Sequence, residues 1–288
     1  MPLWFILTIV SVTILAFAEI AQKVALNRKD DISAEANNFG VWIFQGTLAL
    51  IYVFLFTKPI FPTLTINLLV KMFALGSIYF WAGTLYYTSY KGGAASVNSI
   101  LVSSSIIVST ALGIIFFHES VTLLKFVGSV IILLAIVYLN YDKKLKWNKS
   151  NNYALAGAAL YGIAFTLDKG FSLEFTPHIY QVLFAFSIGI VGLLYRGKII
   201  VKDLRRIEPN TIKVVFISAL TFFIWNKLNF VAYTVGGEVG RIDSINNAVV
   251  FIIILLEVFL LKDKSNLHKK IISAAIALAG ISILGIVK

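Results

Sequence analysis

The sequence predicts an all-α membrane protein whose ten transmembrane helices form two inverted five-helix repeats. Three observations carry this prediction: the composition, the length of the apolar runs, and landmarks of the first half that recur in the second. Apolar residues make up 59% of the 288 residues, charged residues only 14%, and the mean hydropathy is +0.87. Soluble domains carry about 25% charged residues. A soluble core could not bury this much apolar surface, so lipid must surround it.

Ten apolar runs are each long enough to cross a bilayer, which takes about 20 residues. In order, they cover residues 3–25, 40–57, 67–90, 94–117, 121–141, 152–173, 178–195, 210–234, 238–261 and 267–287. Because the runs are continuous and do not alternate apolar with polar residues, they do not fit a β-barrel. The prolines lie outside the runs or at their starts, where proline is tolerated: Pro2, Pro59, Pro62, Pro177 and Pro209. The first run follows no basic segment and has no cleavage site, so we expect a span rather than a signal peptide.

A shift of 144 residues aligns landmarks of the two halves. They are like residues at matching points: Trp81 and Trp225, Gly92-Gly93 and Gly236-Gly237, Glu119 and Asp263. Since five is odd, two halves of five spans each have opposite orientations. This predicts a first repeat over residues 1–145 and a second over 146–288, with a substrate site between them near mid-membrane.

The basic residues behind the net charge of +11 stand in short clusters between the apolar runs. A nucleic-acid binder would gather them on a soluble face, so we interpret them as membrane-flanking charges and expect no nucleic-acid partner. Almost all follow odd-numbered spans, and the even-numbered connections carry only Lys58. By the positive-inside rule, the odd connections are cytoplasmic and both termini lie outside.

Two stretches resemble the drug/metabolite transporter superfamily, and within it the ten-helix EamA-type transporters. The first stretch runs from Thr88 to Ser96 and precedes an apolar helix that ends in Phe117-His118-Glu119-Ser120, with Lys125 and Gly128 after it. The second, looser stretch surrounds Gly236-Gly237 and Asp263. The proline often found in the fourth helix of such proteins is absent, and Ser103-Ser104-Ser105 stand nearby instead.

The resemblance implies a transporter of amino acids, metabolites or drugs, or an exchanger of sugar phosphates or nucleotide sugars. It also implies cytoplasmic termini, which contradicts the orientation given by the charge count. Both orientations therefore stay open.

Charged residues within spans are costly in lipid and usually face an interior cavity. The acids Asp168, Glu238 and Asp243 balance the bases Lys169, Lys227 and Arg241 near the membrane face that bears the even connections. We predict that they form an ion-paired gate, with snorkelling into headgroups as the alternative for Glu238 and Arg241. Glu19 and Glu257 are candidate proton-coupling carboxylates, although Glu19 can instead pair with Lys23 on its own helix. The residues assigned to the gate or to coupling are Glu19, Lys23, Asp168, Lys169, Arg241 and Asp243.

Aromatic and hydrogen-bonding side chains share faces of several spans and predict a cavity for an amphipathic organic solute. Tyr79 and Tyr86 share a face of the third span, and Asn98, Ser105 and Ser109 form a polar stripe on the fourth. Helix packing or an interfacial belt is the alternative for any single residue. The predicted substrate-binding residues are Tyr79, Trp81, Tyr86, Asn98, Tyr161, Trp225, Asn226, Lys227, Asn229, Asn246 and Asn247.

Together these features predict a secondary transporter that moves a small organic solute, an amino acid or amphipathic metabolite, by alternating access, with export as its direction. An exchanger of phosphorylated or nucleotide sugars is the alternative, and an intramembrane enzyme or a channel ranks below it. The sequence has no cysteine and no nucleotide-binding, zinc-protease or hydrolase-elbow motif. We therefore expect no catalytic residue, metal or cofactor. The expected location is the cell membrane, with a small-molecule substrate and the bilayer as partners of a protein that can act as a monomer.

Overall fold

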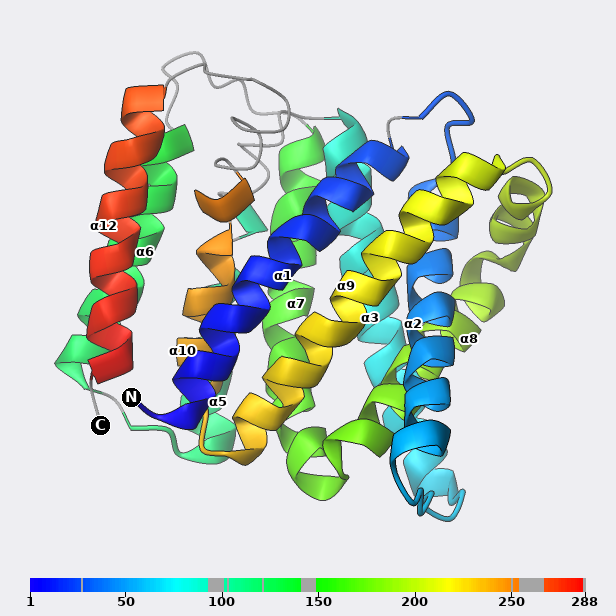
Figure 1. Ribbon diagram of the computed structural model, residues 1–288, viewed down its shortest axis with the longest axis horizontal. Helices are drawn as coiled ribbons and strands as arrows, with labels where there is room; N and C mark the ends of the chain where they lie inside the picture. Colours follow the sequence, from blue (N-terminus) through cyan, green and yellow to red (C-terminus); the bar gives the residue numbers. More distant parts are fainter. Residues whose placement is uncertain are drawn as a thin grey trace.

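The computed structural model consists of helices that cross the molecule in alternating directions (Figure 1). It describes residues 1–26, 28–92, 101–102, 104–120, 122–140, 149–249, 251–253 and 267–286. These residues contain α1 (Leu3–Leu26), α2 (Ala34–Phe56), α3 (Ile66–Gly92), α5 (Ser105–Phe117), α6 (Leu123–Asn140), α7 (Lys149–Glu174), α8 (Pro177–Leu204), α9 (Pro209–Thr234), α10 (Val239–Asn247) and α12 (Leu267–Ile286). Each helix overlaps one of the ten predicted runs, in the same order.

Five of the described helices are long and apolar enough to cross a membrane: α1, α2, α3 over Ile66–Ser89, α8 and α9. Shorter apolar helical segments lie at Ser105–Phe117, Leu123–Ala135 and Ile271–Gly280. No strand occurs among the described residues. The predicted all-α membrane fold is confirmed.

The helix ends follow local chemistry as well as hydropathy. Pro177 and Pro209 begin α8 and α9, where a missing backbone N–H costs nothing. The Ser33 hydroxyl accepts a hydrogen bond from the Ala36 N–H at 3.1 Å and caps α2, which therefore begins earlier than its apolar run. The predicted end of the seventh run, at residue 195, coincides with a kink at Arg196, where φ is −133°. The helix then continues to Leu204, beyond the apolar segment.

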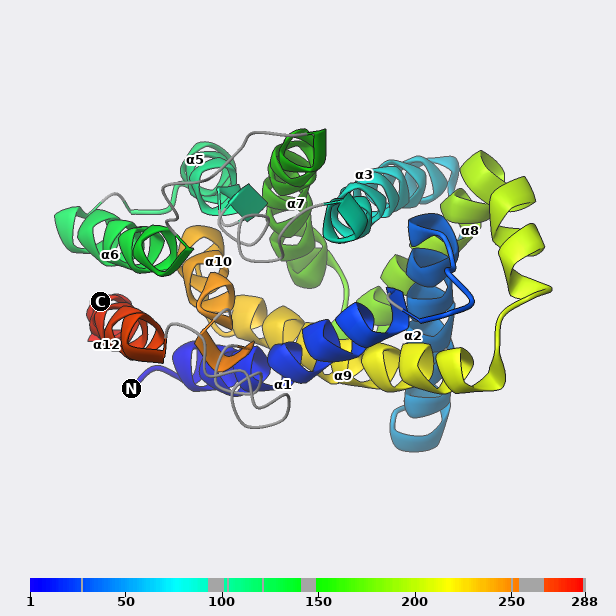
Figure 2. The same cartoon turned by 90° about the horizontal axis from the view of Figure 1, so that it is seen from above.

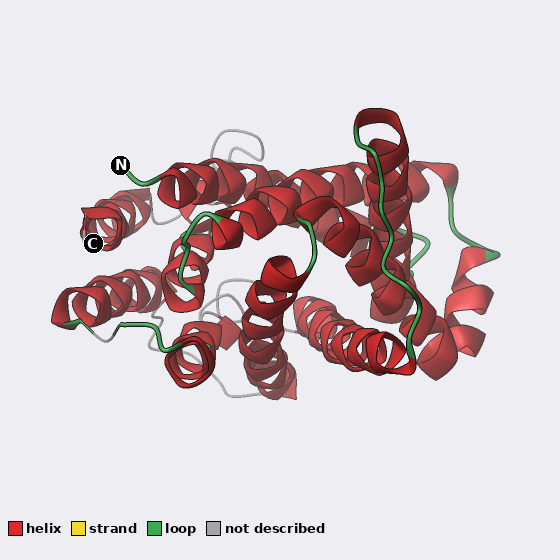
Figure 3. Cartoon of the chain, turned by 90° about the horizontal axis from the view of Figure 1, so that it is seen from below, coloured by secondary structure: helices red, strands yellow, loops and turns green. Residues whose placement is uncertain are grey.

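The helices form two layers with other helices between them. Viewed from above, α1 and α9 make one layer and α3, α7 and α5 the opposite one, with α10 between them (Figure 2). The pair α6 and α12 packs at one end of the molecule. The opposite view shows both termini at this same end (Figure 3), on the side that carries the α2–α3 connection. We call this side, which is at the bottom of Figure 1, the lower side.

The packing partners of the first five helices are repeated by the last five. α1 packs on α9 as α7 packs on α3, and α3 contacts α8 as α9 contacts α2. The pairs α2 with α8, α5 with α10 and α6 with α12 each join a helix to its own counterpart. Two five-helix repeats would produce this pattern. The boundaries at residues 1–145 and 146–288 stay a prediction.

Candidate substrate-binding cavity

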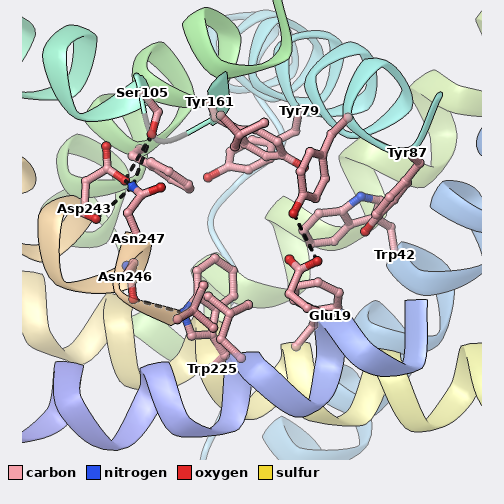
Figure 4. A pocket seen from close by; sticks show the side chains of 16 residues that line it. Glu19, Trp42, Tyr79, Tyr87, Ser105, Tyr161, Trp225, Asp243, Asn246 and Asn247 are labelled. Atoms are coloured by element: carbon pink, nitrogen blue, oxygen red, sulfur yellow. Dashed lines mark hydrogen bonds between the residues drawn. The ribbon is translucent and has the colours of Figure 1, made fainter. Parts of the chain in front are cut away.

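A cavity lies between the helices of the two halves (Figure 4). Its walls come from α1, α2, α3 and α5 of the first half and from α7, α9 and α10 of the second. Eight of the predicted site residues line it: Glu19, Tyr79, Tyr86, Tyr161, Trp225, Asp243, Asn246 and Asn247. Its volume of about 100 Å³ is smaller than the roughly 300–1,000 Å³ typical of ligand pockets. A solute larger than a few water molecules therefore requires the walls to move apart.

One end of the cavity is formed by the Asp243 carboxylate, which is only 1% exposed. It accepts hydrogen bonds from the Ser109 hydroxyl at 2.5 Å, from the Asn247 amide at 2.8 Å and, at 3.4 Å, from the Ser105 hydroxyl. These hydroxyls reach α10 because Gly240 lets it approach α5 closely: a Cβ there would lie 3.1 Å from the Thr110 Cα. In the part of the chain that the structure describes, the hydrogen-bond partners of this carboxylate are all neutral.

A neighbouring part of the wall is an amide and indole network. The Trp225 Nε1 donates to the Asn246 Oδ1 at 3.2 Å, and the Asn246 Nδ2 donates to the Asn229 Oδ1 at 3.1 Å. Asn229 in turn donates to the Trp225 carbonyl at 2.9 Å and to Ser11 at 3.3 Å. Asn246 and Trp225 line the cavity, whereas Asn229 lies behind them and fixes their positions.

Aromatic rings cover much of the remaining wall. Tyr161 and Phe165 are stacked with ring centroids 5.6 Å apart, and Tyr79 and Tyr86 meet the Tyr161 ring edge-on at 6.1 and 6.0 Å. The end of the cavity away from Asp243 contains Glu19 (Figure 4), which accepts a hydrogen bond from the Tyr86 hydroxyl at 3.1 Å. The cavity thus has an aromatic middle between two acidic ends.

Asp168 lies outside the cavity lining, one turn further along α7 from Phe165. Its carboxylate is 3% exposed and accepts hydrogen bonds from the hydroxyls of Tyr79 and Tyr180. We call Asp168, Tyr79 and Tyr180 the acid cluster. Because Tyr79 also lines the cavity, its ring contacts the solute space while its hydroxyl holds the buried acid.

Ion pairs connect the two halves on the lower side. The Lys169 Nζ lies 2.8 Å from the Glu119 Oε1, and the Lys125 Nζ lies 2.6 Å from the Glu238 Oε1. Glu119 also accepts the Val239 backbone N–H at 2.7 Å, at the start of α10. Arg241 is 3.8 Å from Glu238 and stacks over the Trp4 ring at 4.3 Å. We call Glu119, Lys125, Lys169, Glu238 and Arg241 the lower ion-pair group.

The structure therefore pairs the predicted gate residues differently from the sequence interpretation. Asp168 and Asp243 are held by neutral donors rather than by Lys169, Lys227 or Arg241. Lys169 pairs with Glu119, which is a repeat landmark and part of the family resemblance in the sequence but was not assigned to the gate. The α5–α6 connection brings Glu119 and Lys125 to the start of α10, and hydropathy gives no signal for such long-range packing.

Three predicted cavity residues face other helices instead. The Lys227 Nζ lies 2.8 Å from the centroid of the Tyr52 ring, Asn226 donates to the Gln45 Oε1 at 2.5 Å, and Trp81 packs on Tyr195 at 5.9 Å. The helical period explains all three: residues one or two positions after Trp225 or Tyr79 are turned by about 100° or 200°. Asn98 and Glu257 lie outside the described residues, as does the side chain of Lys23.

The sequence interpretation missed Trp42, Tyr87 and Phe222, which also line the cavity. A signal for Trp42 was available. Asn38, Trp42 and Gln45 follow the i, i+4, i+7 spacing of one helix face, and the Trp42 indole donates to the Asn38 Oδ1 at 2.8 Å.

The fold is that of a multi-pass α-helical membrane protein, with a cavity between its helices. Residues 2–141 match the family model described as the EamA-like transporter family, which supports a place in the drug/metabolite transporter superfamily. A solved structure described only as the crystal structure of a protein is similar to the chain, with a TM-score of 0.69. The match covers 96% of this chain and 98% of that one at 12% identity, which shows a shared fold alone. The search of curated proteins gives no match.

Proposed function

We propose that the protein is a secondary transporter that carries a small amphipathic organic solute, an amino acid or a metabolite, by alternating access, with export as its direction. The observation that carries this proposal is the cavity itself, because both halves contribute its aromatic and hydrogen-bonding walls. In transporters built from inverted repeats, the substrate site lies between the repeats near mid-membrane. A rocking motion of one half against the other would open the cavity to one side at a time.

The lower ion-pair group is the proposed gate on the lower side. Its two short ion pairs each join a residue of the first half to one of the second: Glu119 to Lys169 and Lys125 to Glu238. Separating the halves on this side would break both pairs. The acid cluster lies between this group and the cavity along α7. Because Tyr79 bonds Asp168 and also lines the cavity, a bound solute would contact the acid cluster through the Tyr79 ring.

An exchanger of phosphorylated sugars is less well supported. Sites for phosphate use Arg, Lys or helix N-termini as ligands. Among the described residues that line the cavity, none is Lys or Arg. An amphipathic solute without a phosphate group fits the aromatic lining better.

Counterflow in proteoliposomes tests the proposal. Vesicles preloaded with an unlabelled solute should accumulate the labelled solute transiently and in a saturable way, as a carrier requires. Uptake that rises linearly with concentration would instead indicate a channel. A screen of amino acids and amphipathic metabolites by thermal shift on the purified protein selects the solute.

The two repeat-equivalent tryptophans provide a matched pair of variants. Trp225→Leu removes a ring from the cavity wall and should lower counterflow by about tenfold, the effect of losing about 1.4 kcal/mol of binding. Trp81→Leu removes the same ring at the corresponding position, where it packs on Tyr195, and should change counterflow by less than about twofold. Equal losses in the two variants would argue against the cavity as the transport site.

A further inference from the structure

Asp243 is a buried carboxylate at the surface of a cavity, with neutral groups as its hydrogen-bond partners. The charged side chain nearest in sequence, Arg241, is directed to Glu238 and the Trp4 ring. A charged group inside a membrane protein normally faces an opposite charge, because an unpaired charge in a medium of low dielectric constant is costly. The hydroxyls of Ser105 and Ser109 and the Asn247 amide reduce this cost but supply no positive charge. Among the described residues, none that contacts Asp243 carries a positive charge, so a cation would complete the site.

The rest of the cavity favours the same charge. Aromatic rings attract cations through the negative potential of their faces, and Tyr79, Tyr161 and Trp225 contribute rings to the lining. An anionic solute would face the Asp243 carboxylate, and no Lys or Arg is present among the described residues that line the cavity.

We infer that the solute is an organic cation, whose ammonium group binds the Asp243 carboxylate while the aromatic walls hold its apolar part. This inference rests on the proposed transport function and specifies its substrate class. The roughly apolar middle of the cavity requires an amphipathic cation, such as an aromatic or aliphatic amine. A sugar or a free phosphate has no apolar part to fill this region.

A proton is the alternative ligand of the same carboxyl group. When the cavity is empty, the proton neutralises Asp243 and removes the cost of a buried charge. When an ammonium ion R–NH₃⁺ binds, the carboxylic acid loses its proton to the solution and the carboxylate pairs with the ammonium. One positive charge enters the site and one leaves, so the exchange is electroneutral.

Other titratable groups near this site come from several helices. Glu19 on α1, Tyr79, Tyr86 and Tyr87 on α3 and Tyr161 on α7 line the same cavity. Tyr233 on α9 interacts electrostatically with Asp243. Around Asp243, α5 and α6 direct uncharged groups at α10: Ser105 and Ser109 contact Asp243, and Ser129 bonds Ser244 beside it. Charged groups reach the start of α10 instead, where Lys125 pairs with Glu238 and Glu119 accepts the Val239 N–H. A test must therefore assign any released proton by substitution of Asp243 itself.

The test uses three probes of matched shape on the purified full-length protein in detergent. They are 2-phenylethylammonium, the neutral 2-phenylethanol and the anion 3-phenylpropionate. Binding is measured by calorimetry, and proton release by a pH indicator in weakly buffered KCl solution. We expect the ammonium to bind at least about tenfold more tightly than the other two, a difference of about 1.4 kcal/mol, and to release up to one proton per protein.

Two variants assign the effect. Asp243→Asn keeps the size of the side chain and should abolish both the preference for the ammonium and the proton release. Asp203→Asn is the matched control, because Asp203 is also buried (3% exposed) but binds Arg206 and the Ser33 backbone N–H outside the cavity. This control should retain both properties.

Several outcomes overturn the inference. Two concern the probes: equal or tighter binding of the alcohol or the carboxylate, and binding of none of the three. A third is an ammonium preference that survives in Asp243→Asn. The fourth is proton release by NaCl alone, which would indicate an inorganic cation site. Counterflow of a neutral or anionic solute would refute the cation inference and leave the transporter proposal intact. The absence of saturable counterflow for solutes of every charge would refute the transporter proposal.

Discussion

The two halves of the molecule contain buried polar clusters at corresponding places, and these clusters differ in whether they can change charge. The first cluster is centred on α1 of the first half: Gln22 donates to the Ser218 hydroxyl of α9 at 2.6 Å and accepts a hydrogen bond from Asn37 of α2. We call these three residues the amide cluster. The acid cluster is centred on α7 of the second half and joins Asp168 to Tyr79 of α3 and Tyr180 of α8.

The helices correspond one to one: α1, α2 and α9 in the amide cluster take the places of α7, α8 and α3 in the acid cluster. Both clusters tie three helices together in the interior, so their structural role is the same. A neutral amide network holds one arrangement at any pH. A carboxyl group held by two hydroxyls can be charged or protonated. The charged form only accepts hydrogen bonds, whereas the protonated form also donates one. On the proposed transport function, we therefore expect conformational control to be concentrated on the lower side, near the lower ion-pair group.

The largest expected effect is on stability, from the ion pair that lies beside the acid cluster. Glu119→Gln leaves Lys169, whose side chain is only 12% exposed, without its partner. Breaking a buried ion pair by removing one member typically costs about 3–5 kcal/mol. Thermal unfolding of the purified protein in detergent would measure this loss.

The double variant Glu119→Gln with Lys169→Met removes both charges and is the control. It should be closer to wild type in stability than Glu119→Gln alone, because no buried charge is left unpaired. If the double variant is as unstable as the sum of the single variants, the two side chains do not act as a pair and the proposed gate loses its main support.

The second prediction makes the acid cluster resemble the amide cluster. Asp168→Asn keeps an oxygen that accepts from one tyrosine but removes the ionisable group. We expect transport to fall by about tenfold, equivalent to about 1.4 kcal/mol in the transport barrier, with thermal stability unchanged or higher because no charge is buried. Initial rates of counterflow in proteoliposomes would measure the transport loss. A variant with wild-type rates at every pH would show that the charge of Asp168 has no part in transport.

The third prediction separates the two tyrosines of the acid cluster. Both donate to Asp168, but only Tyr79 lines the cavity. Tyr79→Phe and Tyr180→Phe should each cost about 1–2 kcal/mol of stability, the usual range for a lost hydrogen bond to a charged or buried group. Tyr79→Phe alone should also weaken solute binding, by a few-fold. Comparable binding defects in both variants would mean that the acid cluster affects solute binding without direct contact between Tyr79 and the solute.

The sequence predicted the fold well because lipid imposes a strong rule: every span is a long apolar run, and all ten runs overlap a helix. It also predicted cavity residues such as Tyr79, Tyr161 and Asp243, because an ionisable group in a span usually faces an interior cavity and the tyrosines share helix faces with other polar or aromatic residues. Trp81 and Lys227 were wrongly assigned to the cavity, because they were chosen by residue type and their positions on the helix were not compared with those of Tyr79 and Trp225. Trp81 is two residues after Tyr79 and therefore faces α8.

The pairing of the charges could not be predicted in the same way. A count of three acids and three bases is satisfied by many pairings, and only three-dimensional packing selects among them. Glu119 meets Lys169 because the His118 backbone turns with a φ of 51°, which ends α5 and directs the following residues toward α7 and α10. The Tyr180 partner of Asp168 was missed for the same reason: it lies near the start of α8, after a turn at Phe175 and Thr176.

The smallest expected effect on transport comes from the amide cluster. Gln22→Met keeps the length of the side chain but leaves the Asn37 amide without its acceptor. The Ser218 hydroxyl loses the Gln22 donor and keeps its hydrogen bond to the Ala18 carbonyl. Unsatisfied buried polar groups cost about 1–3 kcal/mol, so the melting temperature should fall. Counterflow at a temperature well below the melting transition should stay within about twofold of wild type, since roughly 0.4 kcal/mol or less would then reach the transport barrier. If Gln22→Met instead slowed counterflow as much as Asp168→Asn, the two clusters would be functionally equivalent. Control of the transport cycle would then be shared by both halves rather than concentrated on the lower side.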